Sequence, residues 1–269
     1  MKYFYTEARP TIMERRVLSL LPFVILVSAY TIFSYTHDIT PAKLVPTPVQ
    51  IFEGFLWSLQ ENAQGVIPLL KDTLASGSLF LVSLVIILFA IPAGAMMGVF
   101  PYFEANFRLF TLVIDKVPAV AILPILFITM GTGHLGKVAF IVFAIFSIIS
   151  LDTYHRAKDV PVQQKWKAKA LGATDWEVAF RVVLPQILPQ AMNTVRLNIK
   201  PMLLLLLAAE GFSAEFGIGK RVFLHQRWND MDVILAYVIW GTVLLMLVNW
   251  LFELFIKWRY KWSQIKEGE

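Results

Sequence analysis

The chain has 269 residues, of which 57% are hydrophobic and 16% are charged. A soluble domain carries about a quarter charged residues, so this composition excludes an ordinary soluble protein and indicates a membrane protein. The absence of cysteine excludes disulfides and Cys-ligated metals. The net charge of +5 lies on residues that flank apolar runs and not in a separate basic domain, which argues against nucleic-acid binding.

The first apolar run extends from Val17 to Tyr35. About 20 mostly apolar residues are enough for a helix to cross the hydrocarbon layer. The preceding Arg15 and Arg16 faintly resemble a twin-Arg export signal, but no cleavage site of small residues follows the run. We therefore interpret residues 17–35 as an uncleaved transmembrane helix that follows an N-terminal segment, residues 1–16.

Five more apolar runs follow the first one. They are Leu74–Phe100, Phe107–Met130, Leu135–Leu151, a run between Ile187 and Phe212, and Val233–Ile256. Backbone polar groups in lipid must pair within their own segment, so helices are the expected conformation. The sequence thus predicts an all-α integral membrane protein with six transmembrane helices, five of them in a core over residues 74–256.

The external segment 36–73 contains a Pro-rich stretch, Pro41–Pro48, that leads into Val49–Leu59. The apolar residues of Val49–Leu59 fall at helical spacing, which predicts a short amphipathic helix. Such a helix either lies on the outer membrane interface or packs against the bundle, and the pattern fits both.

Lys and Arg are concentrated in residues 1–16, 152–200 and 257–269. The middle segment holds eight of them against four acidic residues. With six spans, all three segments fall on one side of the membrane. The positive-inside rule then predicts that both termini and this loop are cytoplasmic.

Residues 152–190 form the most informative loop. A helix is expected to begin after Pro161 and to stop at Gly172, and either Thr174 or Asp175 can cap a second helix. Small residues near the turn would let another protein's groove approach closely.

The second helix of the loop is expected to run to Leu184. Pro185 and Pro189 are then expected to turn the chain towards the membrane.

The spacing in this loop resembles a known family. Gly172 is followed thirteen residues later by Pro185, with Leu184 before it, as in the cytoplasmic loop motif of ABC importer permeases of the type I fold. That motif begins Glu-Ala-Ala, whereas this chain has Trp166–Ala168 there. The missing glutamate removes any ion pair that the family makes through it.

Other motifs extend the resemblance from about Pro41 to Trp258. They are Val45–Pro48, Lys116–Pro124, Gly131–Lys137, Leu171–Ala173, Arg181–Pro185 and Ala209–Glu210. Together they look like the subfamily that imports nitrate, sulfonates, taurine or bicarbonate.

The resemblance implies a homodimer in a bacterial inner membrane that sits on two cytoplasmic ATP-binding subunits. An external solute-binding protein would supply the small-molecule substrate. ATP and Mg²⁺ would bind to the partner ATPase, so this chain would need no cofactor and would not itself be an enzyme. The loop would be the coupling helix that docks on the ATPase, through Ala168, Lys169, Leu171, Gly172, Ala173, Leu184 and Pro185.

Polar residues inside apolar spans are candidates for the translocation pathway, because charges in a membrane usually face a cavity or each other. These candidates are Asp115, Lys116, Asn193, Arg196, Asn198 and Glu210. Asp115 and Lys116 either form a structural pair near the cytoplasmic interface or line the pathway. Arg196 either draws anions inward or anchors the helix at the interface. Glu210 is either a gate or a helix-packing residue.

Gly131–Lys137 has the spacing of a phosphate-binding loop. Val138 stands where the Mg²⁺-binding hydroxyl would be required, and the segment joins two apolar runs, so we predict a tight external turn instead. The histidines at 37, 134, 155 and 225 share no metal-ligand spacing, and no catalytic cluster is evident.

The sequence can be weighed against three functional classes: a transport subunit, an intramembrane enzyme, and an ion channel or membrane scaffold. A transport subunit fits the loop and its docking tip. An intramembrane enzyme would need a nucleophile with its base, or metal ligands, within the spans, and the sequence offers neither. An ion channel or a membrane scaffold would need no ATPase partner, and therefore no docking loop.

Overall fold

The computed structural model describes residues 12–36, 45–61 and 65–262, without the side chains of Ile12, Arg15 and Arg16. Most of the predicted N-terminal segment, part of the Pro-rich stretch and the end of the tail therefore lie outside the described residues. Within the described ranges the chain forms helices joined by short turns, and no strand. The all-helical prediction is confirmed for this part of the chain.

Four helical segments of the described residues are long and apolar enough to span a membrane, judged by length and composition. They are α1 (Ile12–Thr36), the consecutive helices α3 (Pro68–Leu88) and α4 (Ala90–Val99), α7 (His134–Asp159) and α13 (Met231–Arg259). Two bent pairs raise the total to six if each pair is one span. The six-span prediction agrees with that upper number.

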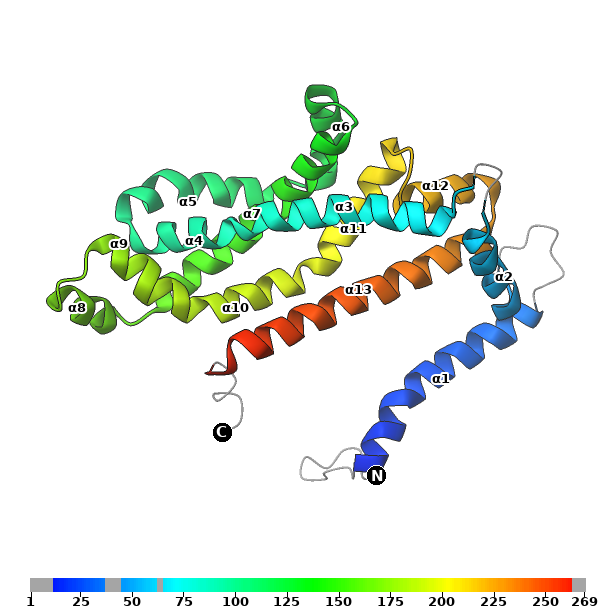
Figure 1. The fold of residues 1–269 in the computed structure, drawn as a ribbon, viewed down its shortest axis with the longest axis horizontal. Coiled ribbons are helices and arrows are strands. Elements are labelled where there is room, and N and C mark those ends of the chain that lie inside the picture. Colours follow the sequence, from blue (N-terminus) through cyan, green and yellow to red (C-terminus); the bar gives the residue numbers. More distant parts are fainter. Residues whose placement is uncertain (1–11, 37–44, 62–64, 263–269) are drawn as a thin grey trace.

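The predicted third span is not one straight helix. The structure has α5 (Pro101–Lys116) and α6 (Ala119–Met130), which are bent by 103°. Proline disfavours helical geometry in the residue before it, and Val117 is extended, with φ −77° and ψ 125°. The predicted Phe107–Met130 span is therefore a broken one, and α6 projects from the bundle (Figure 1).

Helix α7 lies at the centre of the bundle, in contact with α3, α4, α5 and α6 and with two later helices, α10 (Leu184–Leu197) and α11 (Ile199–Ser213). Its contact with α4 is especially close. A Cβ atom built on Gly94 would lie 2.3 Å from the Ser150 carbonyl oxygen, and one on Gly98 would lie 2.4 Å from the Ala157 Cβ. Small residues allow membrane helices to pack at such short range.

The predicted amphipathic helix is α2 (Pro48–Leu59), which Thr47 caps together with Gln50. It packs against the beginning of α13. A Cβ on Gly54 would lie 2.9 Å from the backbone carbonyl carbon of Asp232. Of the two alternatives from the sequence, the structure therefore favours packing against the bundle.

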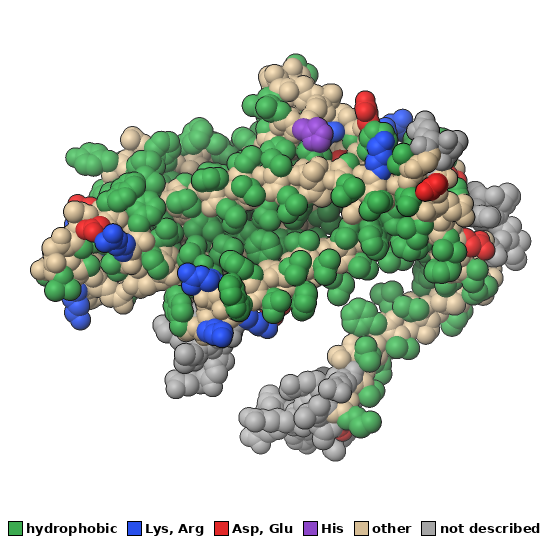
Figure 2. Space-filling model, in the orientation of Figure 1, with side chains coloured by type: hydrophobic (Ala, Val, Ile, Leu, Met, Phe, Trp, Pro, Cys, Tyr) green, Lys and Arg blue, Asp and Glu red, His purple; other side chains and the backbone are tan. Residues whose placement is uncertain are grey.

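Helix α1 diverges from the other helices (Figure 1), and only 6% of its apolar stretch is buried within the chain. Hydrophobic side chains cover the middle of the face drawn in Figure 2, and most charged side chains lie towards its ends. This distribution is the one that a hydrocarbon layer around the middle of the molecule requires.

The close contact between α4 and α7 predicts that Gly94→Ala destabilises the fold. The added methyl group meets backbone atoms that cannot rotate away, and such overpacking typically lowers the free energy of unfolding by about 1–3 kcal/mol. Thermal unfolding in detergent measures the change. Gly77→Ala on α3 is the matched control, because no atom lies within 4 Å of its added Cβ. An equal melting temperature for the two variants would contradict this account of the contact.

Candidate functional site

The first candidate site is a helical hairpin that begins with α8 (Val162–Ala170). Gly172 has φ +89°, a conformation that side-chain-bearing residues rarely adopt. Its N–H donates to the Lys169 carbonyl at 2.9 Å, and the Ala173 N–H donates to the Ala168 carbonyl at 3.0 Å. These two bonds form a Schellman motif, which ends α8 at the predicted glycine.

Thr174 begins the second arm of the hairpin, and α9 (Asp175–Glu177) follows it. The Thr174 hydroxyl accepts from the Glu177 N–H at 3.3 Å, and the Glu177 carboxylate accepts from the Thr174 N–H at 3.1 Å. This reciprocal pair is a capping box. It decides between the two predicted caps in favour of Thr174.

The second arm does not end at Leu184, and Pro185 and Pro189 do not turn the chain, so that prediction was wrong. A π-helical segment, η2 (Val178–Val183), follows α9 and leads into α10. The Leu184 N–H reaches the Ala179 carbonyl, five residues back. We attribute the wider turn to the prolines, which cannot donate the usual bonds. As a result, residues Asp175–Ser213 form one helical stretch.

The hairpin is fastened to the bundle on its inner side. Ala168 and Ala173 pack on a buried cluster that includes Ala157, Val178 and Val183. The Lys165 ammonium donates to the Ala157 carbonyl at 3.0 Å. Burial, with the nearby Lys158 charge, lowers the pKa of Lys165 below its usual value.

The outer side of the hairpin faces away from the bundle, at the end of the molecule where α8 is labelled in Figure 1. Leu171 is 89% exposed and Trp166 is 68% exposed. Helix α8 carries three lysines and no acidic residue. Lys169 forms an ion pair with Asp175 across the turn.

The seven predicted coupling residues thus separate into two groups. Lys169, Leu171, Gly172 and Pro185 are exposed, whereas Ala168, Ala173 and Leu184 are partly buried against the bundle. The surface at the tip therefore does not consist of small residues alone, as predicted. A large apolar side chain and lysines also face outward.

A second polar site surrounds the start of α12 (Ile218–Trp228). The first N–H groups of a helix have no partner within that helix. Here the N–H groups of Gly217, Ile218 and Gly219 donate to the side chains of Asp72, Ser76 and Glu210, at 3.0, 2.8 and 2.9 Å. We call these three side chains, with Arg221 and Tyr237, the α12 junction.

The junction accounts for Glu210. The Ser76 hydroxyl lies 2.7 and 2.9 Å from its two carboxylate oxygens, and the Glu210 side chain is fully buried. A Cβ on Gly217 would lie 2.5 Å from that carboxylate. Because both carboxylate oxygens are already bonded, the geometry favours helix packing over a gate.

Asp72 is the second buried acid of the junction. It accepts from the Arg221 guanidinium at 2.8 Å and from the Tyr237 hydroxyl at 3.0 Å. Sequence reasoning singled out Glu210 but missed Asp72, Ser76, Arg221 and Tyr237. The sequence does hold a signal for the Asp72–Arg221 pair. An acidic and a basic residue that each lie beside an apolar run can be expected to pair with each other.

The remaining pathway candidates are not gathered in one place. Asp115 and Lys116 form an ion pair of 2.9 Å, as one alternative predicted. The pair lies at the bend between α5 and α6, and the Lys116 side chain is 80% exposed.

Arg196 is held by two neighbours. Its guanidinium lies 3.1 Å from Glu253 on α13 and donates to the Asn193 side-chain oxygen at 3.0 Å. The Asn198 side chain donates to the Thr194 carbonyl at 2.9 Å. These contacts favour a structural anchor over free, anion-attracting groups.

One polar cluster that joins α7 to α10 was missed in the sequence. Arg156 donates to Asp152 at 2.7 Å, to Gln190 at 3.1 Å and to the Thr194 hydroxyl at 3.3 Å, and Thr194 donates to Asp152 at 2.6 Å. The four-residue spacing of Asp152 and Arg156 was a visible signal. The cluster ties the hairpin's second arm to the central helix.

The segment Gly131–Lys137 is a helix-to-helix connection. Helix α6 ends at Met130 and α7 begins at His134, and Gly131 has φ +81°. No strand precedes it in the described chain, so the structural context of a phosphate-binding loop is absent.

Comparison with known proteins gives a match to one family model, described as "Binding-protein-dependent transport system inner membrane component", over residues 86–261. These residues make up more than half of the chain. The match includes the hairpin and four of the five predicted core spans in full.

Individual relatives agree with this match. The taurine transport system permease protein TauC of Escherichia coli (strain K12) is 27% identical over 238 residues, which are 88% of this chain and 85% of TauC. A protein of Brucella melitensis biotype 1 named as a probable ABC transporter permease is 25% identical over 82% of this chain and 87% of its own length. SsuC of E. coli K12, named for aliphatic sulfonates transport, is 25% identical over 53% of this chain and 56% of its own.

The α12 junction predicts that Glu210→Ala destabilises the protein. The change leaves the Gly219 N–H without a partner in a buried site, and a buried unsatisfied group typically lowers the free energy of unfolding by about 1–3 kcal/mol. Thermal unfolding in detergent is the measurement. Glu215→Ala, five residues along the chain and exposed, is the control and should leave the melting temperature unchanged. The assignment of Glu210 to helix packing fails if both variants have the same melting temperature as the native protein.

Proposed function

Because the chain belongs to the family of binding-protein-dependent transport system inner membrane components, we propose that it forms the translocation pathway of an ATP-driven importer and takes its motion from a separate ATPase. The chain is a multi-pass membrane protein and a permease subunit. The finer assignments that follow concern its docking, partners and substrate.

The hairpin at Gly172 is the observation that carries the proposal. Its outer side offers an exposed Leu171 and a lysine-bearing helix to a partner. Its second arm continues as one helical stretch into the apolar bundle as far as Ser213. A force applied at the tip can therefore act on the apolar bundle through a helical stretch of the same chain.

The partners that fit this arrangement are a second copy of the chain, two cytoplasmic ATP-binding subunits and an external solute-binding protein. The ATPase would bind ATP and Mg²⁺, and this chain would bind neither. The support is the family assignment together with a docking tip that lies beyond the end of the central helix α7. A docking groove on the ATPase would have to accommodate apolar and basic side chains, since the outer side of α8 presents both.

The proposed substrate is a small anion of the sulfonate or taurine class. The names of two relatives support this class. TauC is named for taurine transport, and SsuC is named for the transport of aliphatic sulfonates. The proposal also includes nitrate and bicarbonate, the other small anions of the subfamily that the sequence resembles. The binding protein would select among these anions before the permease receives them.

The proposed location is a bacterial inner membrane, with both termini and the hairpin in the cytoplasm. Eight Lys or Arg residues against four acids over 152–200 support this orientation by the positive-inside rule. An ion channel or a scaffold without an ATPase is the alternative. Co-purification from the native host decides between them, since an importer brings an ATP-binding subunit with it and a channel does not.

The docking role predicts that Gly172→Glu abolishes substrate uptake and the stimulation of ATP hydrolysis by substrate-loaded binding protein. The variant adds bulk and negative charge at the tip, in a backbone conformation with φ +89° that strains any side chain. Uptake into vesicles and ATP hydrolysis by the reconstituted complex are the two measurements.

Gly133→Glu is the control for this variant, because it makes the same change in the turn at the other end of α7, where φ is −74° and no atom lies within 4 Å. Membrane insertion is checked for both. Full uptake by an inserted Gly172→Glu protein would contradict docking at this turn.

A further inference from the structure

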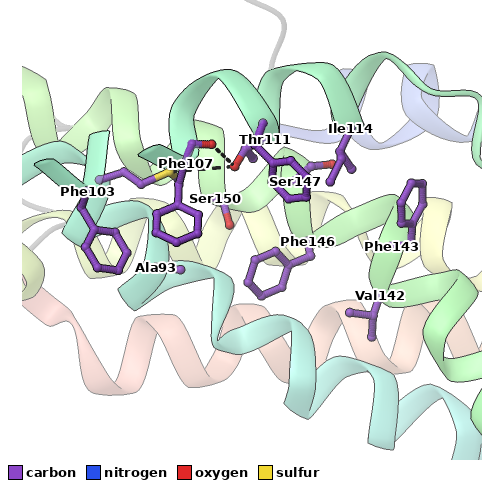
Figure 3. A pocket seen from close by; sticks show the side chains of 12 residues that line it. Ala93, Phe103, Phe107, Thr111, Ile114, Val142, Phe143, Phe146, Ser147 and Ser150 are labelled. Atoms are coloured by element: carbon purple, nitrogen blue, oxygen red, sulfur yellow. Dashed lines mark hydrogen bonds between the residues drawn. The ribbon is translucent and has the colours of Figure 1, made fainter. Parts of the chain in front are cut away.

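An apolar cavity of about 420 Å³ lies between α4, α5 and α7 (Figure 3). Five phenylalanines dominate its wall, and they are Phe103, Phe107, Phe110, Phe143 and Phe146. The hydroxyls of Thr111 and Ser150 donate to the backbone carbonyls of Phe107 and Ala90. The surface that the cavity offers to a ligand is therefore almost entirely hydrocarbon and aromatic.

The cavity has the length of one half of a bilayer. Its lining residues on α5 extend from Phe103 to Ile114, eleven residues apart along one helix. At 1.5 Å per residue this distance is about 16 Å, and half of a hydrocarbon core of about 30 Å is about 15 Å. One acyl chain of a single leaflet matches this depth.

The end of the cavity at the α4–α5 turn is polar and carries excess positive charge. On α7 the stripe of cavity residues Phe143, Ser147 and Ser150 continues at the same helical spacing to Tyr154 and Lys158. Tyr154 donates its hydroxyl to Glu104, and Lys158 pairs with the same carboxylate.

Arg108 adds a second cation at this end. Its guanidinium lies 5.7 Å from the centre of the Tyr154 ring, and the Lys158 ammonium lies 5.8 Å from it. No ion pair of Arg108 is found among the described residues. Two cations thus lie near one acid, Glu104, which leaves a net positive charge at this end of the apolar cavity.

We propose that this cavity is a binding site for an anionic phospholipid, with one acyl chain among the phenylalanines and the phosphate beside Arg108 and Lys158. The leaflet is the one that contains the α4–α5 turn, which is the cytoplasmic leaflet in the proposed orientation. The site does not depend on the transport function, because it follows from the depth of the cavity, its lining and the positive charge at one end alone.

Two other occupants fit less well. The proposed anionic substrate would lose its hydration in a cavity lined by aromatic rings, and no cation inside the cavity would replace the lost water contacts. A helix of a second copy would need no cationic pair at one end. An anionic phospholipid accounts for both features, because its acyl chain matches the apolar depth and its phosphate matches the positively charged end.

Photo-crosslinking in lipid nanodiscs tests the site. The probes are phosphatidylglycerol and phosphatidylcholine, each with a diazirine on one acyl chain, and the readout is the labelled peptides of α5 and α7. We expect phosphatidylglycerol to label these peptides about fivefold more than phosphatidylcholine, the preference that one unpaired cation near the surface provides. Equal labelling by the two lipids would overturn the headgroup assignment.

Matched variants separate the cavity from ordinary lipid contact. Ile114→Trp fills the deep end and should reduce labelling of the α5 and α7 peptides. Val113→Trp adds the same side chain at an exposed neighbouring position and should not. Arg108→Gln should remove the preference for phosphatidylglycerol, whereas Arg259→Gln at the end of α13 should retain it.

Two further results would overturn the proposal. One is equal labelling in the Ile114→Trp and Val113→Trp proteins, which would mean that the label comes from general lipid contact. The other is efficient crosslinking between two copies through Phe107→Cys, which would assign the cavity to a second protomer. Because the chain has no cysteine of its own, any such crosslink arises at the introduced site.

Discussion

One helical stretch joins the proposed docking tip to the interior of the bundle, and the proposed coupling depends on it. The stretch begins at Asp175, three residues after Gly172, and continues through Pro185, Pro189 and Pro201, with a π-helical turn ahead of the first two. A break at Pro185 would have left the hairpin as a separate appendage. Because the backbone hydrogen bonds continue, a displacement of the hairpin must displace α10 as well.

Polar clusters brace this stretch against its neighbours at several levels. Arg156 and Asp152 tie it to α7, Arg196 and Glu253 tie it to α13, and the α12 junction holds its far end against α3. Each cluster links helices that are distant in sequence. In an apolar surrounding, where an unpaired polar group is costly, such contacts favour a defined arrangement of helices. The stretch can therefore act on several spans at once.

The sequence was a good guide where the signal is local. Apolar runs located the spans, and Gly172 and Thr174 ended and began the hairpin helices, because a left-handed glycine and a capping box depend on neighbouring residues only. It was a poor guide to the passage through Pro185 and to the α12 junction. The junction joins residues such as Asp72 and Arg221 that are far apart in the chain, and a proline next to an apolar run permits either a kink or a continuous helix. Tertiary packing selects between these outcomes.

The continuity of the helical stretch is most directly tested by interrupting it while leaving α8 and Gly172 unchanged. Replacing Arg181 and Val182 with two glycines weakens the helix within the π-helical segment, since glycine is a poor helix former. Substrate imported per ATP hydrolysed, in proteoliposomes that contain the complete importer, is the quantity to measure. The account predicts that the ATPase still co-purifies and hydrolyses ATP but that import per ATP falls sharply. Unchanged import per ATP in this variant would contradict it.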